Sequence, residues 1–261
     1  MKAEFRRRLM PATLALSRAA TTVPSWLTGL LGREKPALTP EQAGRLAAWQ
    51  ALPPADPYRP LAESRYVVVD VESSGLNVVK DRLIAIGAIA VNRGRIELTD
   101  SMEIVLQQEK VSGKDNILIH GITGEAQREG VPPVDALLAF LDYVGKDPLI
   151  AFHVAFDNTM ISKTIRRYLG CKFEHDWADL AHISPSLYPE LSYKRRSLDQ
   201  WTEEFGIGNF ARHSALADAL STAELMLALR PRMHKQKIDS FRRMRDTYLA
   251  HRRATSPLSG M

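Results

Sequence analysis

The stretch Tyr66-Val67-Val68-Val69-Asp70-Val71 sets the fold, because it is β-branched along most of its length and apolar on both faces. Such a stretch is typical of a strand buried in the centre of a sheet. Two more strand-like stretches follow at residues 83–91 and 96–106, with the turn residues Asn92-Arg93-Gly94 between them. The three stretches together predict a meander.

Helical and strand-like patterns alternate after this meander. Residues 134–144 and 155–169 are predicted to be helices, the second ending at Gly170, with a short buried strand at 149–152 between them. Residues 198–205 and 215–229 add two helices, and the last has an apolar stripe. This order predicts an α/β protein in which a mixed central sheet is flanked by helices.

The length of 261 residues allows one well-buried domain with shorter segments at its ends. We assign residues 61–230 to the domain, 1–60 to a basic, proline-rich N-terminal arm and 231–261 to a basic C-terminal tail. Residues 1–35 hold seven Lys and Arg against two acidic residues, and residues 230–261 hold nine against two. Basic ends are compatible with polyanion binding, or with nothing more than solvation.

Composition excludes several classes of protein. Hydrophobic residues make up 45% of the chain and charged residues 25%, which is ordinary for a globular protein. The single cysteine, Cys171, cannot form an internal disulfide and fits a reducing compartment, so we expect a cytoplasmic protein. No uninterrupted apolar run of about 18 residues occurs, so no membrane span is expected.

Asp70 and Glu72 lie two residues apart in the first strand, so their side chains should share one face of the sheet. Two like charges on an otherwise apolar strand cost free energy unless a cation offsets them. The alternative is that the strand ends at Asp70 and that water solvates both carboxylates.

Three later residues fit the same chemistry. Asp157 is expected in the first turn of a helix, where an acid taken alone is most often a helix cap or is favoured by the helix dipole. Asp218 interrupts an apolar helix face and should point inward, so either a cation or a hidden arginine must compensate its charge. His213 is expected on the loop that enters the same helix, either as a structural hydrogen-bonder or as a base.

Four carboxylates without a Cys or His cluster of zinc spacing favour Mg²⁺ or Mn²⁺. Such a set could hold two ions about 4 Å apart across a phosphodiester. A nearby imidazole could accept the proton of the attacking water.

Three motifs carry a family resemblance: Asp70-Val-Glu72-Ser-Ser-Gly75, His153-Val-Ala-Phe-Asp157 and His213-Ser-Ala-Leu-Ala-Asp218-Ala219. They resemble the exonuclease motifs of the DEDDh group in the DnaQ-like superfamily, which includes the proofreading (epsilon) subunit of bacterial DNA polymerase III. The resemblance covers about residues 65–230 and implies an RNase H-like fold. It implies that the four carboxylates of these motifs bind two Mg²⁺ or Mn²⁺ ions and that the histidine of the third motif is the general base.

The resemblance also implies a set of residues that bind the substrate: Ser73, Ser74, Gly75, Leu76, His120 and Phe156. The two serines stand where the family usually has threonines, and Val154 replaces a common asparagine. Leu76 could wedge against the 3′-terminal base or simply pack in its turn. Residues 194–196, Lys-Arg-Arg, could contact phosphates.

These observations predict a metal-dependent 3′→5′ exonuclease that releases nucleoside monophosphates, preferably from single-stranded DNA. The same chemistry on RNA is the nearest alternative, since the motifs do not report on the 2′-hydroxyl. A non-catalytic module that recruits a polymerase is disfavoured, because no carboxylate or base is missing.

The sequence leaves open whether the protein binds a DNA polymerase. The C-terminal residues could form a docking helix or pack on their own domain, and residues 236–241 weakly resemble a clamp-binding peptide. We predict that truncation after Leu229 leaves hydrolysis intact; loss of activity in a truncated chain that still folds would show that these residues belong to the active domain.

Overall fold

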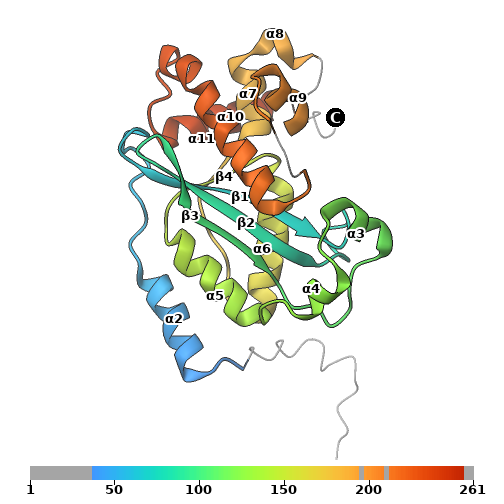
Figure 1. Cartoon of the computed structure of the whole chain (residues 1–261). Coiled ribbons are helices and arrows are strands. Elements are labelled where there is room, and N and C mark those ends of the chain that lie inside the picture. The colour runs from blue at the N-terminus through green and yellow to red at the C-terminus, as the bar shows by residue number, and fades with distance from the viewer. Residues whose placement is uncertain (1–36, 194–196, 209–211, 256–261) are drawn as a thin grey trace, which may run out of the picture. The chain divides into compact units, whose positions relative to one another are not determined.

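The computed structural model describes residues 37–193, 197–208 and 212–255, which belong to one compact unit. At its centre is a five-stranded sheet in the order β3-β2-β1-β4-β5 (Figure 1). The strands are β1 Arg65–Ser73, β2 Leu83–Asn92, β3 Arg95–Val105, β4 Leu149–Ala151 and β5 Trp177–Asp179. The first three strands form an antiparallel meander, and β4 and β5 run parallel to β1. The predicted mixed sheet is therefore confirmed.

Helices cover both faces of this sheet (Figure 1). They are α2 Pro40–Ala51, α3 Lys114–His120, α4 Gly124–Arg128, α5 Pro133–Val144, α6 Val154–Tyr168, α7 Leu180–Leu187, α8 Pro189–Ser192, α9 Leu198–Glu204, α10 Ala215–Lys235 and α11 Phe241–Thr255. One face is covered by α5 and α6, and the other by α7, α10 and α11. Among the described helices, none has the length and apolar character that crossing a membrane requires.

Strand β1 divides the core into two apolar clusters. Val67 and Val69 pack in the cluster under α5 and α6, whereas Tyr66 and Val68 pack in the cluster under α10. These side chains are at most 1% exposed, as the β-branched stretch predicts. Because side chains alternate along a strand, Asp70 and the following Glu72 continue the row that faces α10.

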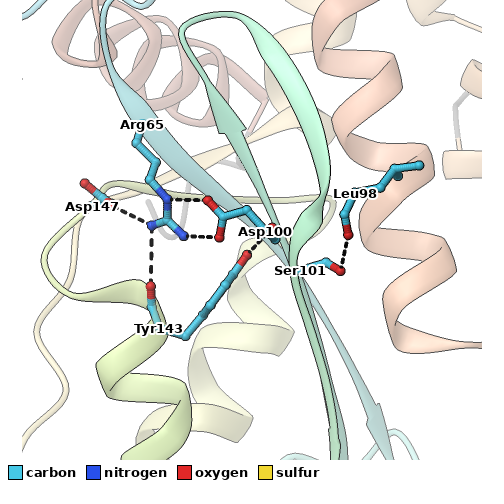
Figure 2. Close-up of polar contacts among 6 residues, drawn as sticks. All are labelled: Arg65, Leu98, Asp100, Ser101, Tyr143 and Asp147. Atoms are coloured by element: carbon cyan, nitrogen blue, oxygen red, sulfur yellow. Dashed lines mark hydrogen bonds and ion pairs between the residues drawn. The ribbon is translucent and has the colours of Figure 1, made fainter.

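Arg65 ties the beginning of β1 to its neighbours (Figure 2). Its guanidinium makes two hydrogen bonds of 2.8 and 2.9 Å to Asp100 in β3 and one of 2.6 Å to Asp147. The Tyr143 hydroxyl donates to the carbonyl of Asp100, which adds α5 to this network. A bidentate arginine–carboxylate pair is geometrically demanding, so the network helps to hold the sheet edge against α5.

The segment before β1 also packs on the domain. Trp49 of α2 is 5% exposed, stacks on Phe173 and donates from Nε1 to the carbonyl of Gly145. Arg45 of the same helix forms an ion pair with Asp142 of α5. The compact unit therefore includes part of the segment that the sequence analysis assigns to the N-terminal arm.

The C-terminal segment packs in the same way. Helix α10 continues through Pro231 to Lys235, and α11 buries Phe241, Met244 and Tyr248 against α7 and the sheet. Of the two alternatives for this segment, the structure shows packing on its own domain. Ile238 and Phe241, the apolar residues of the clamp-like peptide, are 7% and 3% exposed. They are therefore not available to a clamp in this conformation.

Candidate active site

Three carboxylates meet where β1 approaches the start of α10. Asp70, Glu72 and Asp218 each present one oxygen, and these oxygens all lie within 4.8 Å of one another. Asp70 and Glu72 are half-buried, and Asp218 is 5% exposed. The two acids of β1 therefore share one face, as their spacing predicts, and a residue almost 150 positions later completes the group.

Asp157 approaches this group from the other side of β1. It lies in the first turn of α6 and is 3% exposed. Its charge also acts on Asp70, raising the pKa of that carboxyl. Asp157 thus lies close enough to act on Asp70, but it is outside the group of three acids whose oxygens lie within 4.8 Å of one another.

Asp179 holds the beginning of α6 in place. Its buried carboxylate accepts hydrogen bonds from the backbone N–H groups of His153 and Val154, at 3.0 and 3.1 Å, and from that of Ala181 at 2.9 Å. It therefore anchors both α6 and α7 at the end of β5. Asp179 was not predicted as a site residue, because β5 has only three residues and therefore no periodicity in the sequence.

Arg212 compensates part of the charge of Asp218. Its Nη1 lies 2.6 Å from Oδ2 of Asp218, and its Nε lies 2.5 Å from Oδ1 of Asp199 in α9. Of the two alternatives for Asp218, a cation or a hidden arginine, the arginine is present. Asp218 also accepts a hydrogen bond of 3.1 Å from the backbone N–H of His213.

Gly87 allows α10 to approach the sheet beside Asp70. It pairs with Asp70 across the β1–β2 ladder. A Cβ atom at position 87 would lie 2.1 Å from the carbonyl carbon of Ala215 and 2.2 Å from the nitrogen of Leu216. Only glycine fits this close approach, and a glycine inside an apolar strand was the one sequence signal that could have revealed it.

His213 lies on the loop that enters α10, as predicted, and its side chain is exposed. Its φ of 63° is in the left-handed region, where a non-glycine residue is strained. His153, which precedes α6, has a φ of 74°. Both helices that carry a buried aspartate in their first turn are therefore entered through a strained histidine.

Burial and mutual repulsion perturb the acids of this site. Burial raises the pKa of Asp70 well above its ordinary value, and three neighbouring carboxylates raise it further. Burial and then repulsion by Asp218 raise the pKa of Glu72 to about 8. Burial likewise raises the pKa of Asp157. A cluster of hard oxygen donors that resists ionisation on its own is well suited to divalent cations, so the residues present fit such ions.

The loop after β1 carries several of the predicted substrate-binding residues. Ser73 Oγ donates to the carbonyl of Gly75 at 2.6 Å, and Ser74 Oγ to Asp81 at 3.0 Å. A Cβ at Gly75 would lie 2.5 Å from Asp81, so the loop requires glycine there. Leu76 is 89% exposed, which argues against its packing in the turn.

Two other predicted substrate-binding residues lie in different surroundings. His120 is 5% exposed; its Nδ1 accepts from the Ile122 N–H, and its Nε2 lies 3.3 Å from Ser112 Oγ. Burial lowers the pKa of His120, and both ring nitrogens are engaged within the domain. Phe156 is partly buried against the core. Residues 194–196 lie outside the described part of the chain.

Comparison with known sequences agrees with this geometry. A family model described as exonuclease, RNase T, matches residues 67–226. The DNA polymerase III subunit epsilon of Aquifex aeolicus is 29% identical over 170 residues, covering 65% of this chain and 82% of that protein. PolC-type DNA polymerase III of Bacillus subtilis is 30% identical over 173 residues, covering 66% of this chain and 12% of the polymerase.

Other relatives extend the same picture. A PolC-type polymerase of Thermotoga maritima is 28% identical over 71% of this chain, which spans only 13% of that polymerase. Among solved structures, Escherichia coli exonuclease I in complex with a dT13 oligonucleotide superposes with a TM-score of 0.56 at 18% identity, over 67% of this chain and 43% of that one. The cell-death related nuclease CRN-4 gives 0.57 at 13% identity, over 67% and 65%.

These structures share the fold, and the family model covers more than half of the chain. The sheet order, the flanking helices and the matched residues agree with the RNase H-like fold predicted from the motifs. The chain belongs to the RNase T family of exonucleases, within the DnaQ-like superfamily.

Proposed function

We propose that the protein is a metal-dependent 3′→5′ exonuclease that releases nucleoside monophosphates, preferably from single-stranded DNA. The observation that carries the proposal is the meeting of Asp70, Glu72 and Asp218, with oxygens within 4.8 Å of one another, beside the buried Asp157. The apolar core offers no other reason to gather these acids, since each unpaired charge there destabilises the fold.

Asp70, Glu72, Asp157 and Asp218 would hold two Mg²⁺ or Mn²⁺ ions. Bound there, the ions would supply Lewis-acid stabilisation of the charge that develops on the phosphate oxygens. Arg212 would give up part of its contact with Asp218 when the cations bind, and its second partner, Asp199, keeps the guanidinium nearby.

His213 would act as the general base. It would accept a proton from the water whose oxygen attacks the phosphorus, while the bond from phosphorus to the 3′-oxygen of the preceding nucleotide breaks. The released 3′-oxygen would take a proton from solvent. The exposed position of His213, with its backbone bonded to Asp218, supports this role.

The loop Ser73–Leu76 would receive the terminal nucleotide. Leu76, exposed at the tip, would stack against the 3′-terminal base, and the backbone around Gly75 would contact its sugar. Such contacts read the backbone and a base face, not base identity, so the enzyme would be sequence-tolerant. RNA as substrate is the alternative, since no described contact senses a 2′-hydroxyl.

We propose a replicative DNA polymerase as the partner of this protein. Its relatives include a DNA polymerase III subunit epsilon and PolC-type DNA polymerases III. The non-catalytic recruitment module is the alternative of another class. The complete set of acids favours the enzyme over it.

The test compares the wild-type chain with Asp157→Ala, His213→Ala and the control Glu174→Ala, an exposed acid remote from the site. Each protein is incubated with matched single-stranded DNA and RNA, labelled at the 3′ or the 5′ end, in Mg²⁺, Mn²⁺ or EDTA. We expect stepwise 3′ shortening by the wild type and the control, none in EDTA and none by Asp157→Ala.

The His213→Ala variant separates the base from the metal site. It should lose hydrolysis by about 100-fold or more, yet keep the rise in melting temperature that Mn²⁺ causes in the wild type. If folded wild-type protein cleaves no substrate in either metal, the enzyme proposal is wrong and the recruitment module gains support.

A further inference from the structure

A polar pocket, which we call the basic pocket, lies beside the β1–β2 loop, and no residue of α10 lines it. Its volume is about 700 Å³. Five cationic side chains line it, from the β1–β2 loop, the segment after β3, helix α4 and the end of α6: Lys80, Arg82, Lys110, Arg128 and Arg167. Glu109 is the one acidic residue among its lining residues. The acids of the candidate active site do not line it.

Among the residues that the structure describes, the cations of this pocket have no carboxylate partner. Within the described ranges, no ion pair of 4.0 Å or less involves any of the five. Elsewhere in the domain the exposed or half-buried arginines Arg45, Arg65 and Arg232 are each paired with an acid. Like charges gathered without a counter-charge repel one another, so an external anion would stabilise the arrangement.

Part of the pocket is built rigidly. Arg82 is half-buried, and its guanidinium donates from Nε to Gln108 Oε1 at 3.2 Å and from Nη2 to the carbonyl of Lys110 at 2.6 Å. Gln108 is 8% exposed and donates in turn to the carbonyls of Leu83 and Leu106. A guanidinium oriented in this way is a good partner for phosphate oxygens, because little conformational entropy is lost on binding.

The pocket is continuous with the loop proposed to receive the terminal nucleotide. The Ser74 N–H donates to the carbonyl of Arg82 at 2.9 Å, and the Arg82 N–H donates to Ser74 Oγ at 3.0 Å. Lys163 of α6 donates to the carbonyl of Val78, which fixes the loop between Ser74 and the pocket. A strand whose 3′ end lies at Ser73–Leu76 thus has a cationic surface directly beside it.

We propose that the basic pocket binds phosphates of the nucleic-acid strand on the 5′ side of the terminal nucleotide. The inference rests on the proposed exonuclease function and adds a residue set to it. The pocket holds the phosphodiester backbone, which DNA and RNA share, and so sets affinity for long substrates without contributing to the chemical step.

The test uses two variants with equal net charge. The pocket variant is Lys80→Gln, Lys110→Gln, Arg128→Gln and Arg167→Gln, which leaves the structural Arg82 in place. The control variant is Arg95→Gln, Lys172→Gln, Lys235→Gln and Arg253→Gln, four exposed cations that do not line the pocket. Both are made also with Asp157→Asn, so that binding of fluorescent 12-nucleotide DNA and RNA can be followed without hydrolysis.

We expect the pocket variant to bind both 12-mers at least about tenfold more weakly than the control at low salt. The slope of log affinity against log salt should fall by about 0.7 for each phosphate that the variant no longer neutralises. A larger loss of affinity for one of the two polymers would identify the natural source of the phosphates. Equal affinities and equal salt slopes for the pocket and control variants would overturn the proposal.

A substrate with no upstream phosphate separates this proposal from the proposed function. Hydrolysis of the p-nitrophenyl ester of thymidine 5′-monophosphate, measured with Asp157 intact, should be the same for the wild type, pocket and control variants within about twofold. If no protein hydrolyses the ester or an oligonucleotide, the exonuclease proposal fails, while the binding measurement still decides whether the pocket holds a polyanion.

Discussion

Arg212 lies 2.6 Å from Asp218, so the guanidinium of a residue next to the proposed general base neutralises one of the proposed metal ligands. The same arginine is held by Asp199 at 2.5 Å. An arginine and a metal ion compete for the same buried carboxylate, so metal binding weakens the ion pair. This exchange gives a measurable link between folding and metal binding.

We expect Arg212→Gln to lower the melting temperature of the metal-free protein and to enlarge the rise caused by saturating Mn²⁺. Removing the arginine leaves Asp218 less compensated, which destabilises the metal-free fold by about 1–3 kcal/mol. Bound Mn²⁺ then raises the stability of the variant by more than it raises that of the wild type. Calorimetry in EDTA and in Mn²⁺ measures both effects.

The control is Arg45→Gln, which removes an exposed arginine from its ion pair with Asp142, far from the acids. It should change both melting temperatures by a similar small amount, since surface ion pairs contribute about 0–1 kcal/mol. An Mn²⁺-induced rise in Arg212→Gln no larger than that of the wild type would show that the arginine does not compete with the metal.

The acid cluster should make the metal-free protein less stable as pH rises. The pKa of Glu72 is raised to about 8 in the fold, above its ordinary value in an unfolded chain. The contribution of protonated Glu72 to the free energy of unfolding is therefore fully present below the pKa of the unfolded chain. It is lost as pH rises through about 8. One such proton lowers the free energy of unfolding by at most about 1.4 kcal/mol per pH unit.

Urea unfolding in EDTA between about pH 6.5 and 8.5 checks this dependence; lower pH is avoided because buried histidines also titrate there. Glu72→Gln should reduce the decline, and saturating Mn²⁺ should flatten it in the wild type, since bound cations favour the ionised acids. A decline that is identical in wild type and Glu72→Gln would contradict the raised pKa.

Gly87→Ala should disable the site without touching an acid. The added Cβ would meet the backbone of Ala215 and Leu216, so the first turn of α10 must shift and take Asp218 with it. We expect a loss of about 1–3 kcal/mol in unfolding free energy, a smaller Mn²⁺-induced rise in melting temperature and weaker hydrolysis.

Gly44→Ala is the matched control, because a Cβ there meets no atom within 4 Å and position 44 lies inside α2. It should stabilise the protein by about 0.5–1 kcal/mol and leave hydrolysis unchanged. If Gly87→Ala keeps full activity and metal response, the close approach of α10 to β2 is not what places Asp218.

Site residues could be predicted from the sequence where the periodicity of one strand or one helix determines their position. The alternation along β1 places Asp70 and Glu72 on one face, and the apolar stripe of 215–229 turns Asp218 inward, so three of the four acids could be placed from periodicity. The pairing of Gly87 with Asp70 and the ion pair of Arg212 with Asp199 join distant segments, and no local pattern reports such contacts.

Short helices and strands could not be predicted from periodicity. Four such elements are β5, α3, α4 and α8, which have three to seven residues each. A helix of that length has fewer than two turns, and a strand of three residues shows no alternation, so neither pattern can be recognised. Asp179 was missed with β5 for that reason. Helix α11 was visible as an amphipathic pattern, but whether it faces its own domain or a partner depends on the cluster that receives it.

Truncation after Leu229 should therefore unfold the domain, contrary to the expectation for a separate tail. It would remove Met233, Ile238, Phe241, Met244 and Tyr248 from the cluster that contains Tyr66 and Val68 of β1. Burial of a large apolar side chain contributes roughly 1.5–3 kcal/mol, so the loss is comparable with the whole stability of a typical domain. Circular dichroism and urea unfolding of the truncated chain measure it.

Point variants test the same packing in the full chain. Met244→Ala, at a side chain with 0% exposure, should cost about 2–5 kcal/mol, whereas Arg253→Ala on the exposed side of α11 should change stability by less than about 0.5 kcal/mol. A truncated chain that melts like the wild type and still hydrolyses DNA would instead return residues 230–261 to the role of a tail. Because β1 carries both Tyr66 and Asp70, we expect loss of this packing to reach the acids through the strand itself.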